Sequence, residues 1–122
     1  MHVGLDVHKD FCQAAFLDES GKFVDQRFEN TSSGLAELAL ATKGSEVVME
    51  SSSSSMHVYD SLSQTCSVKM AHPLKVKAIA SARIKTDKID ARTLALLLKA
   101  GMIPESYVPP KGQRQARLVC IL

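Results

Sequence analysis

Apolar and polar residues alternate from the first residues of the chain. Residues 3–7 carry valine, leucine and valine at every second position, which is the period-two pattern of a β-strand. Strands are also predicted over residues 11–17 and 22–28, on either side of the turn-forming segment 18–21 (Asp-Glu-Ser-Gly). Three strands with such short connections predict an antiparallel meander.

Helical and strand patterns alternate further along the chain. Residues 31–33 offer hydroxyl N-caps for a helix that Gly44 ends, and a buried strand follows over residues 46–50. A strand that is reached through a helix is usually parallel to its neighbour. The remaining expected elements are a helix through Tyr59 and Leu62, a strand over residues 67–71, a helix from Pro73 to about Ala82, a loop over residues 84–88, and a helix from about Asp87 to Ala100 that Gly101 caps.

This order of elements predicts an α/β fold. An antiparallel meander followed by parallel strands gives a mixed sheet with helices on both faces, which is the RNase H-like arrangement, although the order alone fits several folds. Pro104, Pro109 and Pro110 break regular structure and indicate a linker. We therefore expect one domain over residues 1–103, and a linker with the start of a next helix over residues 104–122.

Composition narrows the class of protein. The apolar fraction of 45% and the charged fraction of 23% are ordinary for a soluble globular domain. No run approaches the roughly 18 apolar residues of a membrane span, so no membrane is expected. Cys12, Cys66 and Cys120 form no Cys-x-x-Cys pair, which argues against a zinc site or a disulfide framework and predicts reduced thiols in a cytoplasmic protein.

Charge is unevenly distributed, although the net charge is only +2. Acidic residues outnumber basic ones in residues 1–30, whereas basic residues dominate residues 69–99. A basic segment suits a polyphosphate partner, but a solvated helical face explains the same charges equally well.

Four acidic residues occupy positions that suit metal-dependent chemistry: Asp6, Glu50, Asp87 and Asp90. Asp6 lies in the first strand and Glu50 closes the fourth, so parallel pairing would bring both to the carboxyl end of the sheet. Asp87 and Asp90 are three positions apart, which places them on one face of a helix. Clustered carboxylates repel unless a cation neutralises them, and Mg²⁺ or Mn²⁺ prefers oxygen ligands.

These residues also have ordinary structural explanations. An Asp-x-x-Asp at a helix start can simply cap the helix and oppose its dipole. Glu50 is unremarkable at a strand end, whereas Asp6 is more unusual because acids are depleted in strands. His2 and His8 share the predicted face of Asp6; we expect His8 to support the site or face the substrate, and His2 to lie at a frayed end. Metal-dependent phosphoryl chemistry is therefore a hypothesis at this point.

Four segments carry a resemblance to a known family: residues 4–9 (Gly-Leu-Asp-Val-His-Lys), 47–50 (Val-Val-Met-Glu), 85–92 (Lys-Thr-Asp-Lys-Ile-Asp-Ala-Arg) and 104–110 (Pro-Glu-Ser-Tyr-Val-Pro-Pro). They closely resemble the DEDD-type insertion-sequence transposases, relatives of the pilin-gene invertases. The third segment is the most specific. The resemblance implies an RNase H-like fold similar to Holliday-junction resolvases, with Asp6, Glu50, Asp87 and Asp90 as the catalytic, metal-binding tetrad.

The same resemblance implies a function. The chain would be the N-terminal domain of a DNA transposase or recombinase that cleaves and exchanges DNA strands with Mg²⁺ or Mn²⁺. The implied partners are DNA, a structured guide RNA and further copies of the chain, in a dimer or tetramer. We expect the family's C-terminal domain, which supplies a serine nucleophile, to be absent here, so that the fragment alone would not complete transposition.

Basic residues near the acidic positions are expected to bind phosphates without reading sequence. They are Lys75, Lys77, Arg83, Lys85, Lys88 and Arg92. One departure from the family pattern lies beside Glu50. The family commonly has a Thr-Gly pair and an aromatic residue there, whereas this chain has five serines over residues 51–55 and then Met56. We expect a flexible loop at this position.

Two other functions stay open. A free-standing resolvase or ribonuclease of the same fold would hydrolyse nucleic acid with the four acids alone. A catalytically silent fragment would only bind nucleic acid and assemble with other chains. A sugar-kinase-like domain also begins with a Gly-Leu-Asp strand such as residues 4–6, but no phosphate-cradling loop follows here.

Overall fold

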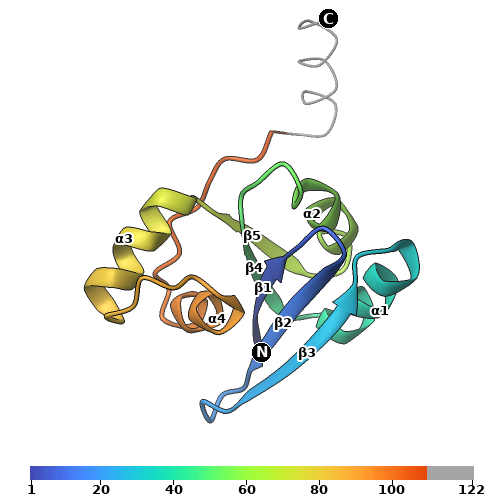
Figure 1. Cartoon of the computed structure of the whole chain (residues 1–122). Coiled ribbons are helices and arrows are strands. Elements are labelled where there is room, and N and C mark those ends of the chain that lie inside the picture. The colour runs from blue at the N-terminus through green and yellow to red at the C-terminus, as the bar shows by residue number, and fades with distance from the viewer. Residues whose placement is uncertain (110–122) are drawn as a thin grey trace, which may run out of the picture.

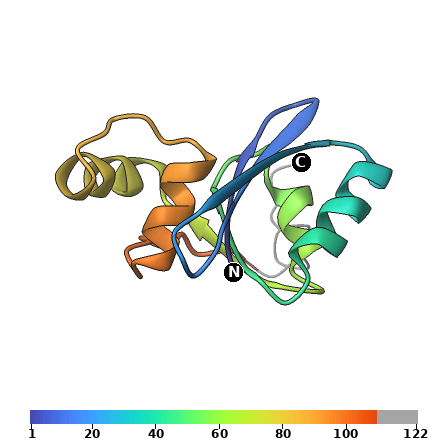
Figure 2. The same ribbon diagram turned by 90° about the horizontal axis from the view of Figure 1, so that it is seen from below.

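A computed structural model describes residues 1–109, in which one mixed sheet lies between two layers of helices (Figures 1 and 2). The strands are β1 (His2–Val7), β2 (Phe11–Leu17), β3 (Phe23–Glu29), β4 (Glu46–Glu50) and β5 (Ser67–Ala71). The helices are α1 (Ser32–Thr42), α2 (Met56–Leu62), α3 (Pro73–Arg83) and α4 (Ala91–Lys99). In this described part of the chain, none of the helices is long and apolar enough to cross a bilayer.

The five strands lie in the order β3-β2-β1-β4-β5. β1 pairs antiparallel with β2, as β2 does with β3, whereas β1 with β4 and β4 with β5 are parallel. The predicted α/β class is therefore confirmed: an antiparallel meander is followed by parallel strands, as in RNase H-like folds. The turn between β2 and β3 follows from its sequence, because the Asp18 carboxylate accepts hydrogen bonds from two backbone N–H groups and Gly21 adopts φ +89°.

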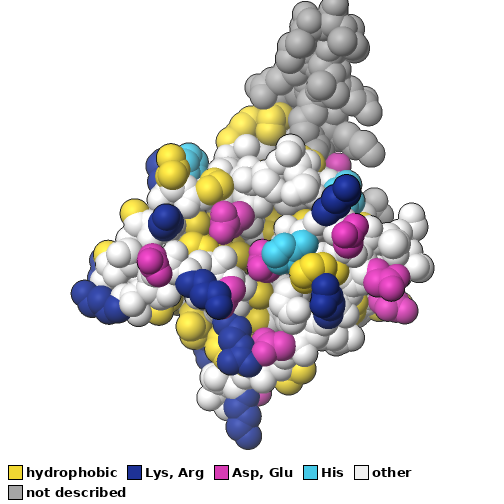
Figure 3. Space-filling view, viewed as in Figure 1, with side chains coloured by type: hydrophobic (Ala, Val, Ile, Leu, Met, Phe, Trp, Pro, Cys, Tyr) yellow, Lys and Arg dark blue, Asp and Glu magenta, His cyan; other side chains and the backbone are white. Residues whose placement is uncertain are grey.

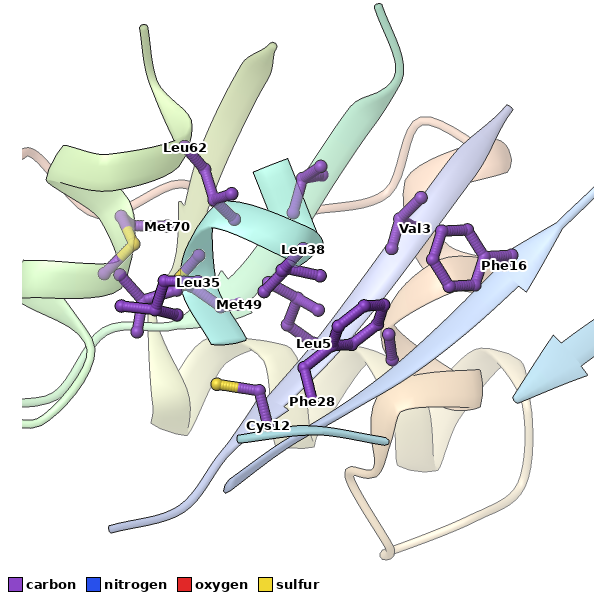
Figure 4. Close-up of a cluster of buried hydrophobic side chains, with 13 residues drawn as sticks. Val3, Leu5, Cys12, Phe16, Phe28, Leu35, Leu38, Met49, Leu62 and Met70 are labelled. Carbon is purple, nitrogen blue, oxygen red and sulfur yellow. The ribbon is translucent and has the colours of Figure 1, made fainter. Parts of the chain in front are cut away.

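Alternate residues of each strand face opposite helical layers. Leu5 and Met49 point toward α1 and α2, where they pack against Leu38 and Leu62 in the larger core cluster (Figure 4). The intervening residues face α3 and α4. Gly4 has no side chain on that face, and a Cβ there would lie only 2.0 Å from the carbonyl oxygen of Ala91. The glycine therefore lets α4 pack directly on the backbone of β1.

The last helix begins later than predicted. α4 begins at Ala91 rather than near Asp87, because Asp90 has an extended backbone and its carboxylate accepts the hydrogen bond of the Thr93 N–H at 2.9 Å. Residues 86–90 form no helix, so the predicted shared helical face of Asp87 and Asp90 is wrong. At the other end, Gly101 follows the helix with φ +71°, as predicted.

The predicted linker starts as a segment attached to the sheet. The backbone N–H of His72 donates to the carbonyl of Pro104 at 2.8 Å, and that of Ser106 donates to Met70 at 2.7 Å. Val108 packs against the larger core cluster. Residues 104–108 thus cover the free edge of β5. Pro110 and the predicted start of a next helix lie outside the described residues.

The close packing at Gly4 is testable by substitution. Gly4→Ala should lower the free energy of unfolding by about 3 kcal/mol, because the added methyl group meets backbone rather than a movable side chain. Urea denaturation would measure the loss. Gly21→Ala is the control: this turn residue has open space around it, and only its positive φ should cost about 1 kcal/mol. Equal losses in the two variants would contradict the role of Gly4.

Candidate functional site

Two of the predicted acids, Asp6 and Glu50, meet in one cavity. Asp6 follows Gly4 on the α4 side of β1, and Glu50 follows Val48 on the same side of β4. The cavity has a volume of about 280 Å³ and lies beside Leu94 of α4. Its lining residues are Leu5, Asp6, Val7, Glu50, Ser52, Ser54 and Leu94. The parallel pairing of β1 and β4 thus brings the two carboxylates together as predicted.

The electrostatics of Glu50 reflect this position. Partial burial raises the pKa of Glu50, and the negative charge of Asp6 raises it further. Two carboxylates that line one cavity are also suited to a divalent cation, since a cation neutralises the charge that raises the pKa of Glu50. Both residues supply the oxygen donors that Mg²⁺ and Mn²⁺ prefer.

Asp90 lies at the N-terminal end of α4, one turn before the cavity residue Leu94. Its Oδ1 caps the helix, and its Oδ2 lies 4.0 Å from Nζ of Lys88. The capping explanation is therefore correct for this residue. One carboxylate oxygen is used by the cap, and the side chain as a whole stays partly exposed.

Asp87 does not line the acidic cavity. It is exposed in the segment between α3 and α4. Among the side chains of residues 1–109, no three from His, Cys, Asp and Glu gather closely enough to hold a metal ion. The structure therefore brings together two members of the predicted tetrad, with Asp90 at the end of the adjoining helix and Asp87 outside.

The segment that carries Asp87 begins with a strained residue. Lys85 adopts φ 64°, in the left-handed region that favours glycine. This conformation turns the chain sharply after α3. The chain then passes through Asp87 on its way to α4.

His8 contacts the acidic site directly. Its Nε2 lies 3.0 Å from Oδ2 of Asp6, and its ring stacks on Phe11 with centroids 4.4 Å apart. His2 is at the other end of β1, where it contacts Glu46 at 3.0 Å and is partly buried. The expected frayed end is therefore wrong for His2, since the ring is held against β4.

The serine run is a hydrogen-bonded turn. Ser55 is buried, and its hydroxyl donates to the backbone carbonyl of Glu50 at 2.9 Å. The same oxygen accepts from the backbone N–H of Ser52 at 3.0 Å. These bonds connect the segment directly after Glu50 to the end of β4, and residues 51–55 form a loop and turn, as expected. Because residues 51–55 are all serine, the sequence did not indicate that Ser55 would be the buried one.

The predicted phosphate-binding residues occupy three places. Lys75, Lys77 and Arg83 are exposed on α3, and Lys85 and Lys88 are exposed in the following segment. Arg92 is held differently: its guanidinium forms hydrogen bonds with the Asp25 carboxylate of β3 and lies 5.1 Å from the centroid of Phe23. Acidic, basic and histidine side chains mix on the face seen in Figure 3.

Comparison with known proteins gives one match. A family model of DEDD transposases of the IS110 type, described as transposase, matches residues 3–119. This match covers nearly the whole chain, including all four predicted acids. None of the curated proteins matches the chain.

Repulsion between the two carboxylates predicts a pH-dependent stability. Because the pKa of Glu50 is raised in the folded chain above its ordinary value of 4.5, the ionised form opposes folding at neutral pH. In EDTA at pH 7, Glu50→Gln should raise Tm by about 2 °C. The gain should be largely lost at about pH 4, below the ordinary pKa, where glutamate is mostly protonated in both states. Glu37→Gln, on an exposed position of α1, is the control. A lower Tm for Glu50→Gln at pH 7 would contradict the repulsion.

The strain at Lys85 predicts a stabilising substitution. Lys85→Gly should raise the free energy of unfolding by about 1 kcal/mol, because glycine adopts φ 64° without a Cβ clash. Lys85→Ala removes the same charge but keeps the Cβ, so it should give no such gain. Chemical denaturation of both variants separates strain from charge, and equal stabilities would count against the strain.

Proposed function

The chain belongs to the DEDD transposases of the IS110 type, and on that premise we propose that Asp6 and Glu50 form the centre of a metal-dependent site for DNA strand cleavage and exchange. The family makes the chain part of a DNA-processing enzyme, with DNA as its partner. One observation carries the metal-dependent part of the proposal: two carboxylates from parallel strands line one cavity, and the charge of one raises the pKa of the other.

The donor set suits a divalent cation. Asp6 and Glu50 would hold Mg²⁺ or Mn²⁺, with Asp90 adding Oδ2, the oxygen that the helix cap does not use. Such an ion supplies positive charge that stabilises the attacking and leaving oxygens of a phosphodiester. Asp87 completes the proposed tetrad from the segment after α3. The family resemblance, rather than its position, is the reason for including it.

The protein's own residues shape the site around that charge. His8 contacts Oδ2 of Asp6, a contact that would orient the carboxylate that lines the cavity. Leu94 of α4 gives the cavity an apolar wall. The basic residues of α3 and the following segment would hold DNA phosphates. They are Lys75, Lys77, Arg83, Lys85 and Lys88.

Arg92 was predicted to bind phosphate as well, and its contacts give it a structural role at the same time. It joins α4 to β3 through Asp25, so a phosphate would have to compete with that carboxylate. A structured guide RNA, a dimer or tetramer, and a serine supplied by a C-terminal domain also belong to the proposal. These three rest on the resemblance stated above.

A silent binding module is the second candidate function. Within residues 1–109 the four acids are not gathered around one point, which favours this candidate for the chain on its own. It would bind nucleic acid through its basic residues and leave cleavage to a larger assembly. The two candidates differ in whether the acidic cavity binds metal.

Calorimetric titration with Mn²⁺ tests the proposed site. The wild-type chain should bind Mn²⁺, and Asp6→Asn and Glu50→Gln should each weaken binding by at least about tenfold, because each removes one charged ligand. Glu37→Gln, which removes an exposed carboxylate on the other face of the sheet, should bind like the wild type.

The titration should be repeated with duplex DNA present. Binding that is lost in both site variants supports the metal site. Absence of binding in the wild type, with and without DNA, would overturn it and leave the silent module as the better account.

A further inference from the structure

The acidic site belongs to a longer row of polar residues across the sheet. Asp6 of β1 pairs with Gln13 of β2, and Gln13 pairs with Arg27 of β3. Directly paired residues point to the same face, so all three side chains lie on the α4 side. Asp25 confirms this assignment, because it lies two residues before Arg27 and binds Arg92 of α4. The row therefore begins at the acidic cavity and ends at a guanidinium.

Arg27 is held in place by a stack of rings. Its Cζ lies 3.5 Å from the centroid of the Phe11 ring, which is close enough for a cation–π interaction. Phe11 in turn stacks on His8, with 22° between the two ring planes, and His8 contacts Asp6. The stack thus links the guanidinium to the carboxylate of the proposed site through direct contacts.

The charge of Arg27 is available to a ligand. The side chain is exposed, and none of the ion pairs among residues 1–109 includes it. Two carboxylates lie on the same face of β3: Asp25, which Arg92 already binds, and Glu29, which no ion pair joins to Arg27. A guanidinium fixed on a ring keeps its planar edge of N–H donors open, and that edge suits the paired oxygens of a phosphate.

We propose that Arg27, stacked on Phe11, is a phosphate-binding site for the DNA strand that enters the acidic cavity. Two strand spacings separate Arg27 from Asp6, roughly 10 Å along the row, so one strand can reach both points. Gln13 lies between them and offers an amide to the same backbone. This inference rests on the proposed function, and it extends the path of the DNA from the acidic cavity to the β2–β3 side, in addition to the basic residues of α3.

Fluorescence anisotropy with a labelled DNA duplex tests the proposal, in EDTA so that metal binding does not contribute. Arg27→Gln should weaken binding about tenfold at low salt, because it removes a charged contact. It should also reduce the slope of log affinity against log salt by about 0.9, the effect of one phosphate contact. Arg27→Lys keeps the charge and should keep the slope.

Two further variants complete the comparison. Phe11→Leu removes the ring and keeps the charge, so affinity should fall about threefold while the slope is retained. Lys43→Gln removes an exposed charge directly after α1, in the other helical layer, and should leave both quantities unchanged. Thermal melting of each variant checks that the fold is intact.

The outcomes separate this inference from the proposed function. If Arg27→Gln keeps the slope of the wild type, or if the wild-type chain binds no duplex at all, the phosphate site is overturned. If Asp6→Asn loses Mn²⁺ binding but Arg27→Gln keeps the salt slope of the wild type, the metal site is supported and the phosphate site is rejected. If the slope is reduced in Arg27→Gln and the wild-type chain binds no Mn²⁺, the phosphate site is supported and the metal site is rejected.

Discussion

The approach of α4 to the backbone of β1 at Gly4 is the contact on which the site depends. With 2.0 Å between a hypothetical Cβ and the Ala91 carbonyl, no other residue type leaves room for the helix. Leu94, Leu97 and Leu98 bury the apolar side of α4 against the sheet, and Arg92 ties its first turn to Asp25. The helix is therefore fixed at its start, where the functional side chains lie.

The position at which α4 begins determines how much of the Asp6 face of β1 it covers. The helix contacts β1, β2 and β4 and begins at Ala91. Asp6 is half-buried and lines the cavity beside Leu94 of this helix, whereas His8, directly after β1, is exposed. A helix beginning one turn earlier, as the sequence pattern indicated, would have covered more of this face. The cap at Asp90 therefore fixes where the helix begins, one turn before Leu94, which lines the cavity.

Much of the fold could be predicted from local pattern and turn chemistry. The strands and the meander follow from period-two alternation and from the Asp18–Gly21 turn, since both signals are local. The meeting of Asp6 and Glu50 was also predictable, because it follows from strand parity and parallel pairing. The Asp87–Asp90 segment was not, because an Asp-x-x-Asp has the same spacing inside a helix as before one. Only the contact between Asp90 and the Thr93 N–H distinguishes these cases.

The contact between Phe11 and Arg27 could not be predicted from the sequence, for a different reason. Phe11 and Arg27 are sixteen positions apart in sequence, and they meet diagonally across β2 and β3. Their contact depends on the register of the hairpin, which the turn at Gly21 sets; a shift of one residue would send each side chain to the other face. Composition, which shows few aromatic residues, argues against stacking as a mode of binding. In this site the Phe11 ring stacks on the Arg27 guanidinium and not on a nucleic-acid base, so a single aromatic residue is enough.

The two faces of β1 affect the stability of the domain in opposite directions. Val3 and Leu5 are buried on one face and contribute to the larger core. Gly4 and Asp6 on the other face contribute little apolar burial, and Asp6 raises the pKa of Glu50, so the acidic cavity opposes folding in the absence of a cation. The domain tolerates this unfavourable charge because Val3 and Leu5, on the opposite face of the same strand, are buried in the larger core cluster. Alternation along a six-residue strand thus supplies both the apolar residues of the core and the carboxylate of the site.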